Sequence, residues 1–266
     1  MARSPGVADR EVLEVQGGIA RPLRDRLAEE VPVAVHYDGE PFAVMMASPG
    51  DLEDFAVGFS LTERRISPGD LLGVEARELL EGIVLDIRTR SPEPPDHPAR
   101  SLPGRSGCGI CGNRLLEDVV RRPPDVGHGI VITAAALEAA LAALQQRQPL
   151  NAATGAIHAA AWCDANGQLQ LVREDVGRHN AFDKLIGALH RAGLEADAGF
   201  ALVTSRASYE MVTKAATAGI PMLVALSAPT ALAVDLAQGC GLSLVGFARP
   251  GRHVVYTHPR RLALGD

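Results

Sequence analysis

The sequence predicts an α/β protein in two parts: a small α+β module, then a larger domain with a mixed sheet and helices on both faces. Three observations predict this class. Strand and helix patterns alternate after residue 199, a separate hairpin-and-helix pattern occupies residues 31–90, and a proline-rich stretch lies between them. The chain has 266 residues, which suits one large domain or two modest ones.

The first part of the chain predicts a tail and then the small module. Residues 1–30 are expected to form an N-terminal tail, and no apolar run typical of a signal peptide opens it. In the module, residues 31–90, two β-rich runs flank Asp38-Gly39, which is a strong hairpin signal. Residues 49–64 then repeat apolar side chains at helical spacing, and residues 82–89 are typical of another strand.

Prolines mark the segment that joins the two parts. Residues 91–125 are expected to form a linker and loop, because five prolines lie between Ser91 and Gly107 and no apolar period runs through them. The linker leads directly into the run Cys108-Gly109-Ile110-Cys111-Gly112. We therefore expect this cysteine pair at or beside a loop, not in a core.

The larger domain, residues 126–266, shows regular alternation. Thr133 is expected to cap a helix that reaches about Arg147, and a hairpin around Asn166-Gly167 precedes a helix at 178–191. The remaining elements are expected to be strand 200–204, helix 208–218, strand 221–226, helix 230–238, strand 242–248 and strand 253–257. Two successive β-α-β crossovers predict parallel strands with helices on the sheet faces.

Charge and cysteine usage exclude some classes of function. The 26 basic and 32 acidic residues give a net charge of −6, which argues against nonspecific nucleic-acid binding. The longest uncharged run, between Lys214 and Asp235, contains glycine and proline and is interpreted as a buried strand between helices, not a membrane span. Four cysteines without an export signal indicate reduced thiols and a cytoplasmic protein.

The cysteine pair is the sharpest candidate for chemistry. Glycines beside Cys108 and Cys111 allow a tight turn and leave sulfur accessible to a large partner, and the thiolate is the nucleophilic form. Two alternatives stay open at this point, a structural zinc site and a dithiol redox switch. No second C-x-x-C is present, and Cys163 and Cys240 stand alone in apolar surroundings.

A second candidate site follows from topology. Ligands of parallel sheets bind beyond the carboxyl ends of the strands, where helix N-termini point their N–H groups. Here three strands end in segments whose hydroxyls and arginines suit an anion such as a diphosphate. The candidate site residues in these segments are Ser205, Arg206, Ser227, Phe247, Ala248, Arg249, Pro250, Gly251 and Arg252. The alternative is that Ser227 and Thr230 cap helices and the arginines form a solvated rim.

Residues 173–180 form the densest polar stretch of the larger domain, at a strand-to-helix junction. A buried charge network that fixes this junction is the interpretation we favour over a ligand site. His158 lies in an apolar run and is interpreted as a core histidine rather than a ligand. Trp162 and Cys163 are expected in the core.

Several ordered blocks together resemble one family. They are Cys108-Gly-Ile-Cys111-Gly, Thr154-Gly-Ala-Ile-His158-Ala-Ala, Arg173-Glu-Asp-Val-Gly-Arg-His-Asn-Ala-Phe-Asp-Lys184, Ser205-Arg-Ala-Ser-Tyr-Glu-Met211, Gly219-Ile-Pro-Met222, Ser227-Ala-Pro-Thr-Ala-Leu-Ala233, Phe247-Ala-Arg-Pro-Gly-Arg252 and Tyr256-Thr-His-Pro259. The series resembles the formate dehydrogenase accessory sulfurtransferase family, FdhD, over about residues 31–262. One departure from the family pattern is Ala156.

The resemblance implies a fold and a mechanism. It implies a cytidine-deaminase-like larger domain and a cysteine desulfurase that passes sulfur to Cys108 as a persulfide. The sulfur would then go to a bis-guanine-dinucleotide molybdenum cofactor, carried as a bound client and needed for formate dehydrogenase activity. The family's cofactor-binding segment maps onto Phe247–Arg252. The resemblance implies no permanently bound metal, and the symmetry of the cofactor suggests a homodimer.

Two other functions are kept as alternatives. A deaminase-like fold raises the possibility of a zinc-dependent nucleobase deaminase, but its H-x-E and P-C-x-x-C strings do not occur after Thr133. The other alternative is a chaperone that binds the cofactor or the enzyme and transfers no sulfur. Metal analysis separates the first from the sulfur carrier, and replacement of Cys108 separates the second.

Overall fold

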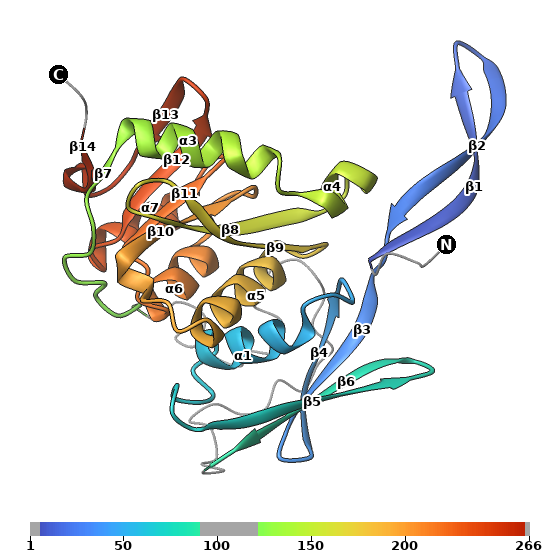
Figure 1. Cartoon of the computed structure of the whole chain (residues 1–266), viewed down its shortest axis with the longest axis horizontal. Helices are drawn as coiled ribbons and strands as arrows, with labels where there is room; N and C mark the ends of the chain where they lie inside the picture. Colours follow the sequence, from blue (N-terminus) through green and yellow to red (C-terminus); the bar gives the residue numbers. More distant parts are fainter. Residues whose placement is uncertain (1–5, 91–121, 264–266) are drawn as a thin grey trace.

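The computed structural model describes residues 6–90 and 122–263 of the chain. Figure 1 shows three parts: a projecting hairpin, a small sheet with one helix, and a larger sheet flanked by helices. Within these two ranges, no helix has the length and apolar character needed to cross a membrane.

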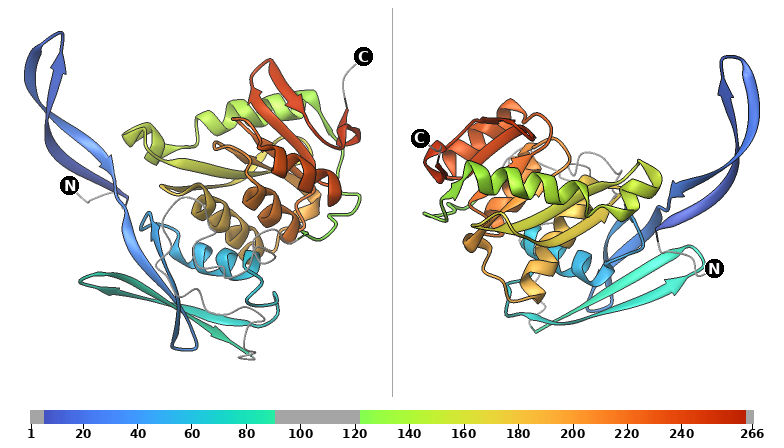
Figure 2. Two further views of the ribbon diagram at one scale, coloured as in Figure 1. Left: turned by 180° about the vertical axis from the view of Figure 1, so that it is seen from behind. Right: turned by 45° about the horizontal axis from the view of Figure 1, so that its top comes forward.

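The predicted N-terminal tail contains a long hairpin. Strand β1 (Val7–Gln16) pairs antiparallel with β2 (Ile19–Ala28) through ten residue pairs, and the two form a sheet of their own. The two-residue turn Gly17-Gly18 has positive φ at both positions, as a type I′ hairpin turn requires. We call this hairpin, residues 7–28, the arm, and it extends away from the rest of the molecule (Figure 1 and Figure 2).

The small module is a four-stranded sheet with one helix packed on it. The strands are β3 (Val31–Tyr37), β4 (Glu40–Ala47), β5 (Leu71–Leu79) and β6 (Gly82–Thr89), in the order β4-β3-β6-β5. Helix α1 (Leu52–Thr62) inserts Phe55 and Phe59 into the core of this sheet. The predicted hairpin around Asp38-Gly39, the helix and the strand at 82–89 are confirmed, whereas β5 was not predicted from the sequence.

The larger domain has a six-stranded mixed sheet in the order β13-β12-β11-β10-β8-β9. Its strands are β8 (His158–Asp164), β9 (Leu169–Asp175), β10 (Gly199–Val203), β11 (Met222–Ala225), β12 (Ser243–Arg249) and β13 (Arg252–Val255). The neighbours β10, β11 and β12 are parallel, as the two crossovers predicted, and β8, β9 and β13 run antiparallel to their neighbours. A short pair, β7 (Ile132–Thr133) and β14 (Leu262–Ala263), lies beside this sheet.

Helices cover both faces of the larger sheet. Helices α5 (Arg178–Arg191), α6 (Tyr209–Thr217) and α7 (Ala231–Gly239) bury Phe182, Met211 and Ala233 on one face, while α3 (Ala134–Gln145) buries Leu137 on the other. Thr133 caps α3 by accepting from the Ala136 amide, as predicted. The short α4 (Pro149–Thr154) and the 3₁₀ turns Ala196–Ala198 and Pro259–Arg261 complete the domain.

The two sheets are joined through helices. Helix α1 lies between the small sheet and α5, so its two sides contact different parts of the molecule (Figure 1). The predicted mixed sheet with helices on both faces, together with a smaller α+β module, is confirmed. This arrangement leaves the carboxyl ends of β10, β11 and β12 at one edge of the larger sheet.

Candidate functional site at the carboxyl edge of the parallel strands

The loops that follow the parallel strands are tied to one another by their backbones. The Leu226 amide donates to the Val203 carbonyl at 2.9 Å, and the Thr230 amide donates to the Ala207 carbonyl at 3.0 Å. The Phe247 amide donates to the Ser227 carbonyl at 3.0 Å. The structure therefore brings the loop after β10, the loop after β11 and the end of β12 together, as strand order predicted.

Phe247 has an unusual backbone conformation at this edge. Its φ of 50° lies in the left-handed region, and the pairing register between β12 and β13 shifts between Gly246 and Arg249. A bulge of this kind redirects a side chain. The Phe247 ring is 38% exposed although both neighbours, Gly246 and Ala248, are buried. An aromatic ring that is held outward by strained backbone is a typical feature of functional sites.

Gly246 allows the loop after β11 to approach the strand. A Cβ at this position would lie 2.8 Å from Pro229 Cδ and 3.0 Å from Tyr256 Cε2. Any side chain would push the Ser227–Thr230 loop away from β12. The close contact between this loop and Phe247 thus depends on a glycine.

The hydroxyl-bearing and basic residues predicted here differ in their accessibility. Ser205 is buried, and its hydroxyl donates to the Arg206 carbonyl at 3.0 Å, whereas the Arg206 side chain is exposed. Ser227 is half-buried. Thr230 accepts from the Ala233 amide at 3.3 Å, so the interpretation of Thr230 as a helix cap is confirmed.

Arg249 and Arg252 lie further along, at the turn between β12 and β13. They face each other across the two strands, and both side chains are exposed. Glu138 of α3 accepts from the Gly251 amide at 2.9 Å and lies 4.0 Å from His253 Nδ1. The predicted segment 247–252 is therefore divided. Phe247 contacts the loop after β11, whereas Arg249 and Arg252 lie at the β12–β13 turn, which is bound to Glu138 of α3.

The structure adds polar residues that the sequence analysis did not assign to a site. His179 at the start of α5 lies 2.8 Å from Glu210 at the start of α6, and both side chains are only slightly exposed. His158 is half-buried at the start of β8 and interacts electrostatically with Arg178 and His179. Burial is the main cause that lowers the pKa of His158; Arg178 and His179 act in the same direction, and Asp175 opposes them.

Most of the polar stretch 173–180 is structural, as we favoured. Asp175 and Lys184 are both fully buried and pair at 2.7 Å. The Asp175 carboxylate also accepts from the Ser48 amide, and Lys184 donates to the Ser48 carbonyl, both at 2.9 Å. Asn180 donates to the Met46 carbonyl at 2.7 Å. The network ties the end of β4 to the start of α5.

The cysteine pair Cys108 and Cys111 lies outside the described residues. The other two cysteines are buried on opposite faces of the larger sheet, Cys163 beside α3 and Cys240 beside α7. Burial raises the pKa of Cys163 to about 12 and also raises that of Cys240. Both are therefore poor nucleophiles near neutral pH.

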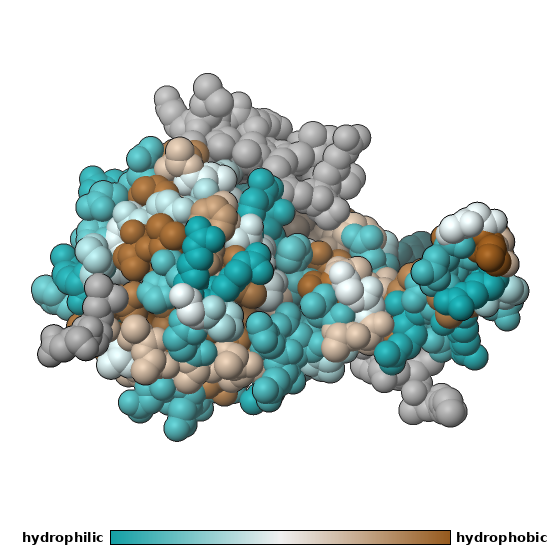
Figure 3. Space-filling model, turned by 90° about the horizontal axis from the view of Figure 1, so that it is seen from above, coloured by the Kyte–Doolittle hydropathy of each residue, from teal (hydrophilic) through white to brown (hydrophobic). Residues whose placement is uncertain are grey.

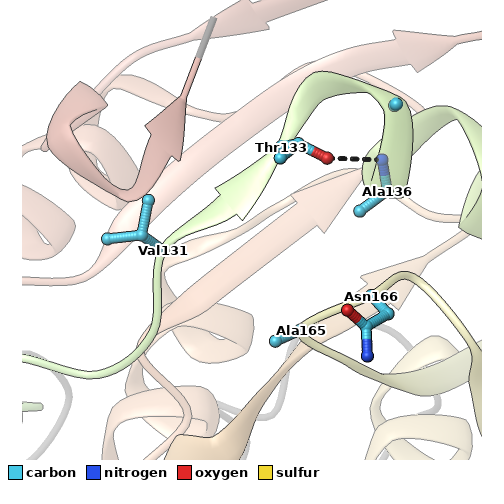
Figure 4. A pocket seen from close by; sticks show the side chains of 6 residues that line it. Val131, Thr133, Ala136, Ala165 and Asn166 are labelled. Atoms are coloured by element: carbon cyan, nitrogen blue, oxygen red, sulfur yellow. Dashed lines mark hydrogen bonds between the residues drawn. The ribbon is translucent and has the colours of Figure 1, made fainter.

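An open depression of about 420 Å³ lies at the opposite edge of the sheet, where α3 begins (Figure 4). Val131, Thr133 and Asn166 line it, together with three alanines. Figure 4 shows that the Thr133 hydroxyl oxygen accepts a hydrogen bond from the Ala136 amide. None of the predicted site residues lines it. Across residues 6–90 and 122–263, no three His, Cys, Asp or Glu side chains cluster to hold a metal.

The fold is that of an α/β protein in which three parallel strands end at one edge of the sheet, the place where ligands of such sheets commonly bind. Comparison with protein families gives a more specific result. The chain belongs to the FdhD/NarQ family, whose model matches residues 28–263. The resemblance seen in the sequence is thus confirmed.

Individual relatives match over nearly the whole chain. A sulfur carrier protein FdhD of Xanthomonas campestris pv. campestris (strain B100) is 56% identical over 268 residues, covering 98% of this chain and 94% of the relative. A protein of the same name from Bordetella petrii is 48% identical over 262 residues, with 97% and 94% coverage.

A solved structure shares the fold. The crystal structure described as a formate dehydrogenase accessory protein from Desulfotalea psychrophila matches with a TM-score of 0.77 and 23% identity. The match covers 97% of this chain and all of that one. At this identity the likeness supports the fold alone.

Proposed function

We propose that this chain is a sulfur carrier and sulfurtransferase. It accepts persulfide sulfur from a cysteine desulfurase on Cys108 and transfers it to the bis-guanine-dinucleotide molybdenum cofactor that formate dehydrogenase requires. The observation that carries the proposal is the match, over at least 97% of this chain, to proteins named sulfur carriers at 48–56% identity. The accessory-protein fold of the Desulfotalea structure agrees with it.

Loading the sulfur is a thiol exchange. The Cys108 thiolate attacks the terminal sulfur of the donor's persulfide, so a new S–S bond forms at Cys108 while the donor's S–S bond breaks and its cysteine leaves as a thiolate. No net oxidation takes place. The exchange needs an accessible thiol, and two of the four cysteines, Cys163 and Cys240, are buried with raised pKa values. This leaves the pair Cys108 and Cys111, and the family resemblance assigns the persulfide to the first of the two, Cys108.

The carboxyl edge supplies what the client needs. The exposed ring of Phe247 offers a surface on which a guanine base can stack. The exposed guanidinium of Arg206 and those of Arg249 and Arg252 match a diphosphate in charge and in hydrogen-bonding geometry. Ser227 stands beside Phe247 and adds a hydroxyl.

The client also suggests two copies of the protein. A cofactor with two guanine dinucleotides presents two equivalent ends. The residues that the structure describes form a single edge of this kind in one copy, so a homodimer would supply both. The proposed chemistry suits the cytoplasm, where thiols are kept reduced.

Mass spectrometry of the intact protein tests the central step. After incubation with a desulfurase and cysteine, the wild-type chain should gain the mass of one sulfur atom. Cys108→Ala should gain none, and Cys240→Ala, the matched control at a buried thiol, should gain as much as the wild type. Loading of Cys108→Ala to the wild-type level would rule out Cys108 as the carrier.

Complementation separates transfer from binding alone. In cells that lack the protein, Cys108→Ala should fail to restore formate dehydrogenase activity. Restoration by this variant would favour a chaperone that binds the cofactor without transferring sulfur. Stoichiometric zinc in the purified protein, lost on replacing both Cys108 and Cys111, would instead support a metal site at the pair.

A further inference from the structure

The arm is an isolated two-stranded sheet with large apolar side chains in solvent. Within the described residues, no third strand pairs with β1 or β2. Leu13, Val15 and Ile19 near its tip are 64%, 64% and 75% exposed, and Leu23 and Leu27 are each 42% exposed. Figure 3 shows brown apolar atoms at the end of the arm. A lone two-stranded hairpin is marginally stable in water, so an arm of this length indicates that a further strand pairs with one of its edges.

The two edges of the arm are not equivalent. Pro22 has no N–H and is paired with Leu13, so this pair is one of the non-hydrogen-bonded pairs of the ladder and the Pro22 nitrogen faces outward. Hydrogen-bonded and non-hydrogen-bonded pairs alternate along the ladder, so the pair Gln16 and Ile19 is hydrogen-bonded. This agrees with the two-residue turn that the pair closes. Proline thus blocks the outer edge of β2. The outer edge of β1 has no proline and is open.

The open edge of β1 is complementary to itself. Residues in non-hydrogen-bonded pairs point their N–H and C=O groups away from the partner strand. Leu13 belongs to such a pair, so the outward groups of β1 are those of its odd-numbered residues. A second β1 that pairs antiparallel must therefore match odd with odd and even with even residues. An axis at Val12 then places Arg10 opposite Glu14 twice, in non-hydrogen-bonded pairs, where side chains are closest.

Other symmetric registers are worse. An axis at Asp9, Arg10, Glu11 or Glu14 sets that charged residue against its own copy. An axis at Leu13, or at any of the remaining residues Val7, Ala8, Val15 and Gln16, avoids this clash but forms no opposite-charge pair within β1. The register centred on Val12 is therefore the one that the charges of β1 select.

We propose that β1 pairs antiparallel with β1 of a second copy across a two-fold axis at Val12. The arms then form one four-stranded antiparallel sheet, in which two copies of β1 are central and two copies of β2 are the proline-blocked edges. An interface of this kind is self-complementary, as two-fold symmetry requires.

The cross-strand neighbours within one arm support this register. Val12 faces Leu23, so the axis creates an apolar row of Leu23, Val12 and their two symmetry copies. Arg10 faces Asp25, and Glu14 both faces Arg21 and forms an ion pair with it. The next row across four strands is therefore Asp25, Arg10, Glu14 and Arg21, in which the sign of charge alternates at every step.

Matched prolines on the two edges test the pairing. Glu11 and Arg24 lie opposite each other in a non-hydrogen-bonded pair, so proline at either leaves the ladder between β1 and β2 intact. Glu11→Pro removes an outward N–H from the open edge, and Arg24→Pro removes one from the blocked edge. Sedimentation of the full chain should give a dimer for wild type and Arg24→Pro, and a monomer, or at least ten-fold weaker dimerisation, for Glu11→Pro.

Charge reversal tests the register. Arg10→Glu alone sets Glu against Glu14 twice, and Glu14→Arg alone sets Arg against Arg10 twice, so each variant should dimerise less than wild type. A mixture of the two variants should form a heterodimer, because every contact across the axis then joins opposite charges.

A monomeric wild type would overturn the proposal. Dimerisation of the Glu11→Pro variant at the wild-type level would also overturn it. In that case the dimer contact would lie on another surface, and the arm would bind a different protein. Failure of the mixed variants to pair would exclude the Val12 register. These measurements need no sulfur or cofactor, so their failure is distinguishable from failure of the proposed sulfur transfer through Cys108.

Discussion

Gly58 of α1 and Gly187 of α5 lie against each other's helices at the centre of the contact between the two sheets. A Cβ on Gly58 would be 1.8 Å from the Asp183 carbonyl oxygen, and a Cβ on Gly187 would be 1.9 Å from the Asp54 carbonyl oxygen. The helices can approach this closely only because both positions lack side chains. Around this contact, buried polar groups from both parts find their partners.

The close approach predicts a large effect of a single methyl group. Gly187→Ala should lower the free energy of unfolding by at least ~1–3 kcal/mol, since overpacking forces the backbones of α1 and α5 apart. Gly239→Ala at the end of α7 is the matched control, because nothing lies within 4 Å of its Cβ. Urea unfolding compares them, and equal stability of the two variants would contradict the packing described.

The buried pair Lys184 and Asp175 predicts a second stability effect. Lys184→Met would leave the Asp175 carboxylate without its cation in a fully buried site, which typically costs roughly 3–5 kcal/mol. Glu53→Gln changes an exposed ion pair with Arg191 and should change stability little. Because Lys184 also binds Ser48 of the small module, we expect the melting temperature of the whole molecule to fall. A melting temperature equal to that of wild type would refute the role of this pair.

Helices and parallel strands were predictable from the sequence because their patterns are local. Helix 178–191 was placed with its observed bounds, and the strand-end loops were expected at one edge because parallel strands must end together. The arm and β5 were missed. Charged and apolar residues are mixed in the arm without the period of two that marks a strand. Strand β5 contains Glu, Ala and Arg, which favour helix, yet pairs with β6.

The site was predictable only in part. The loops that carry Ser205 and Ser227 meet the end of β12 as expected, but the left-handed backbone of Phe247 arises from a bulge between β12 and β13 that no local pattern marks. His179 meets Glu210 across 31 residues of sequence, and the dense polar stretch that contains His179 was the available signal. The sequence favours a structural network there because carboxylates and arginines within the stretch can satisfy each other, and that interpretation gives His179 no separate role.

His158 predicts a pH dependence of stability. Its pKa in the folded protein is lowered by burial and by nearby Arg178 and His179, so below pH 6.5 the unfolded chain binds a proton that the folded chain does not. Stability should therefore fall as pH drops below 6.5. His158→Gln should make this fall shallower, while His128→Gln, at an exposed side chain, should keep the wild-type dependence. Chemical unfolding at several pH values measures this. A His158→Gln curve parallel to wild type would contradict it.

Phe247 predicts a specific loss of guanine nucleotide binding. If the exposed ring stacks on guanine, Phe247→Ala should weaken GDP binding by about ten-fold, since stacking of a base on an aromatic side chain contributes roughly 1–3 kcal/mol. Leu80→Ala, at a 98% exposed apolar residue on the small module, is the control. Calorimetric titration with GDP gives both affinities. Equal values would move the base site away from the carboxyl edge.

The arginines of the β12–β13 turn separate client binding from sulfur loading. Arg249→Ala and Arg252→Ala should each weaken GDP binding several-fold, because a charged hydrogen bond to the diphosphate is lost. Loading of Cys108 with sulfur should remain at the wild-type level, since these side chains take no part in the thiol exchange. Arg147→Ala, an exposed arginine at the other end of α3, should change neither quantity. Calorimetry with GDP and intact mass after treatment with a desulfurase measure the two properties on one preparation. If both fell together in the arginine variants, the turn would serve the fold or the donor and not the client alone.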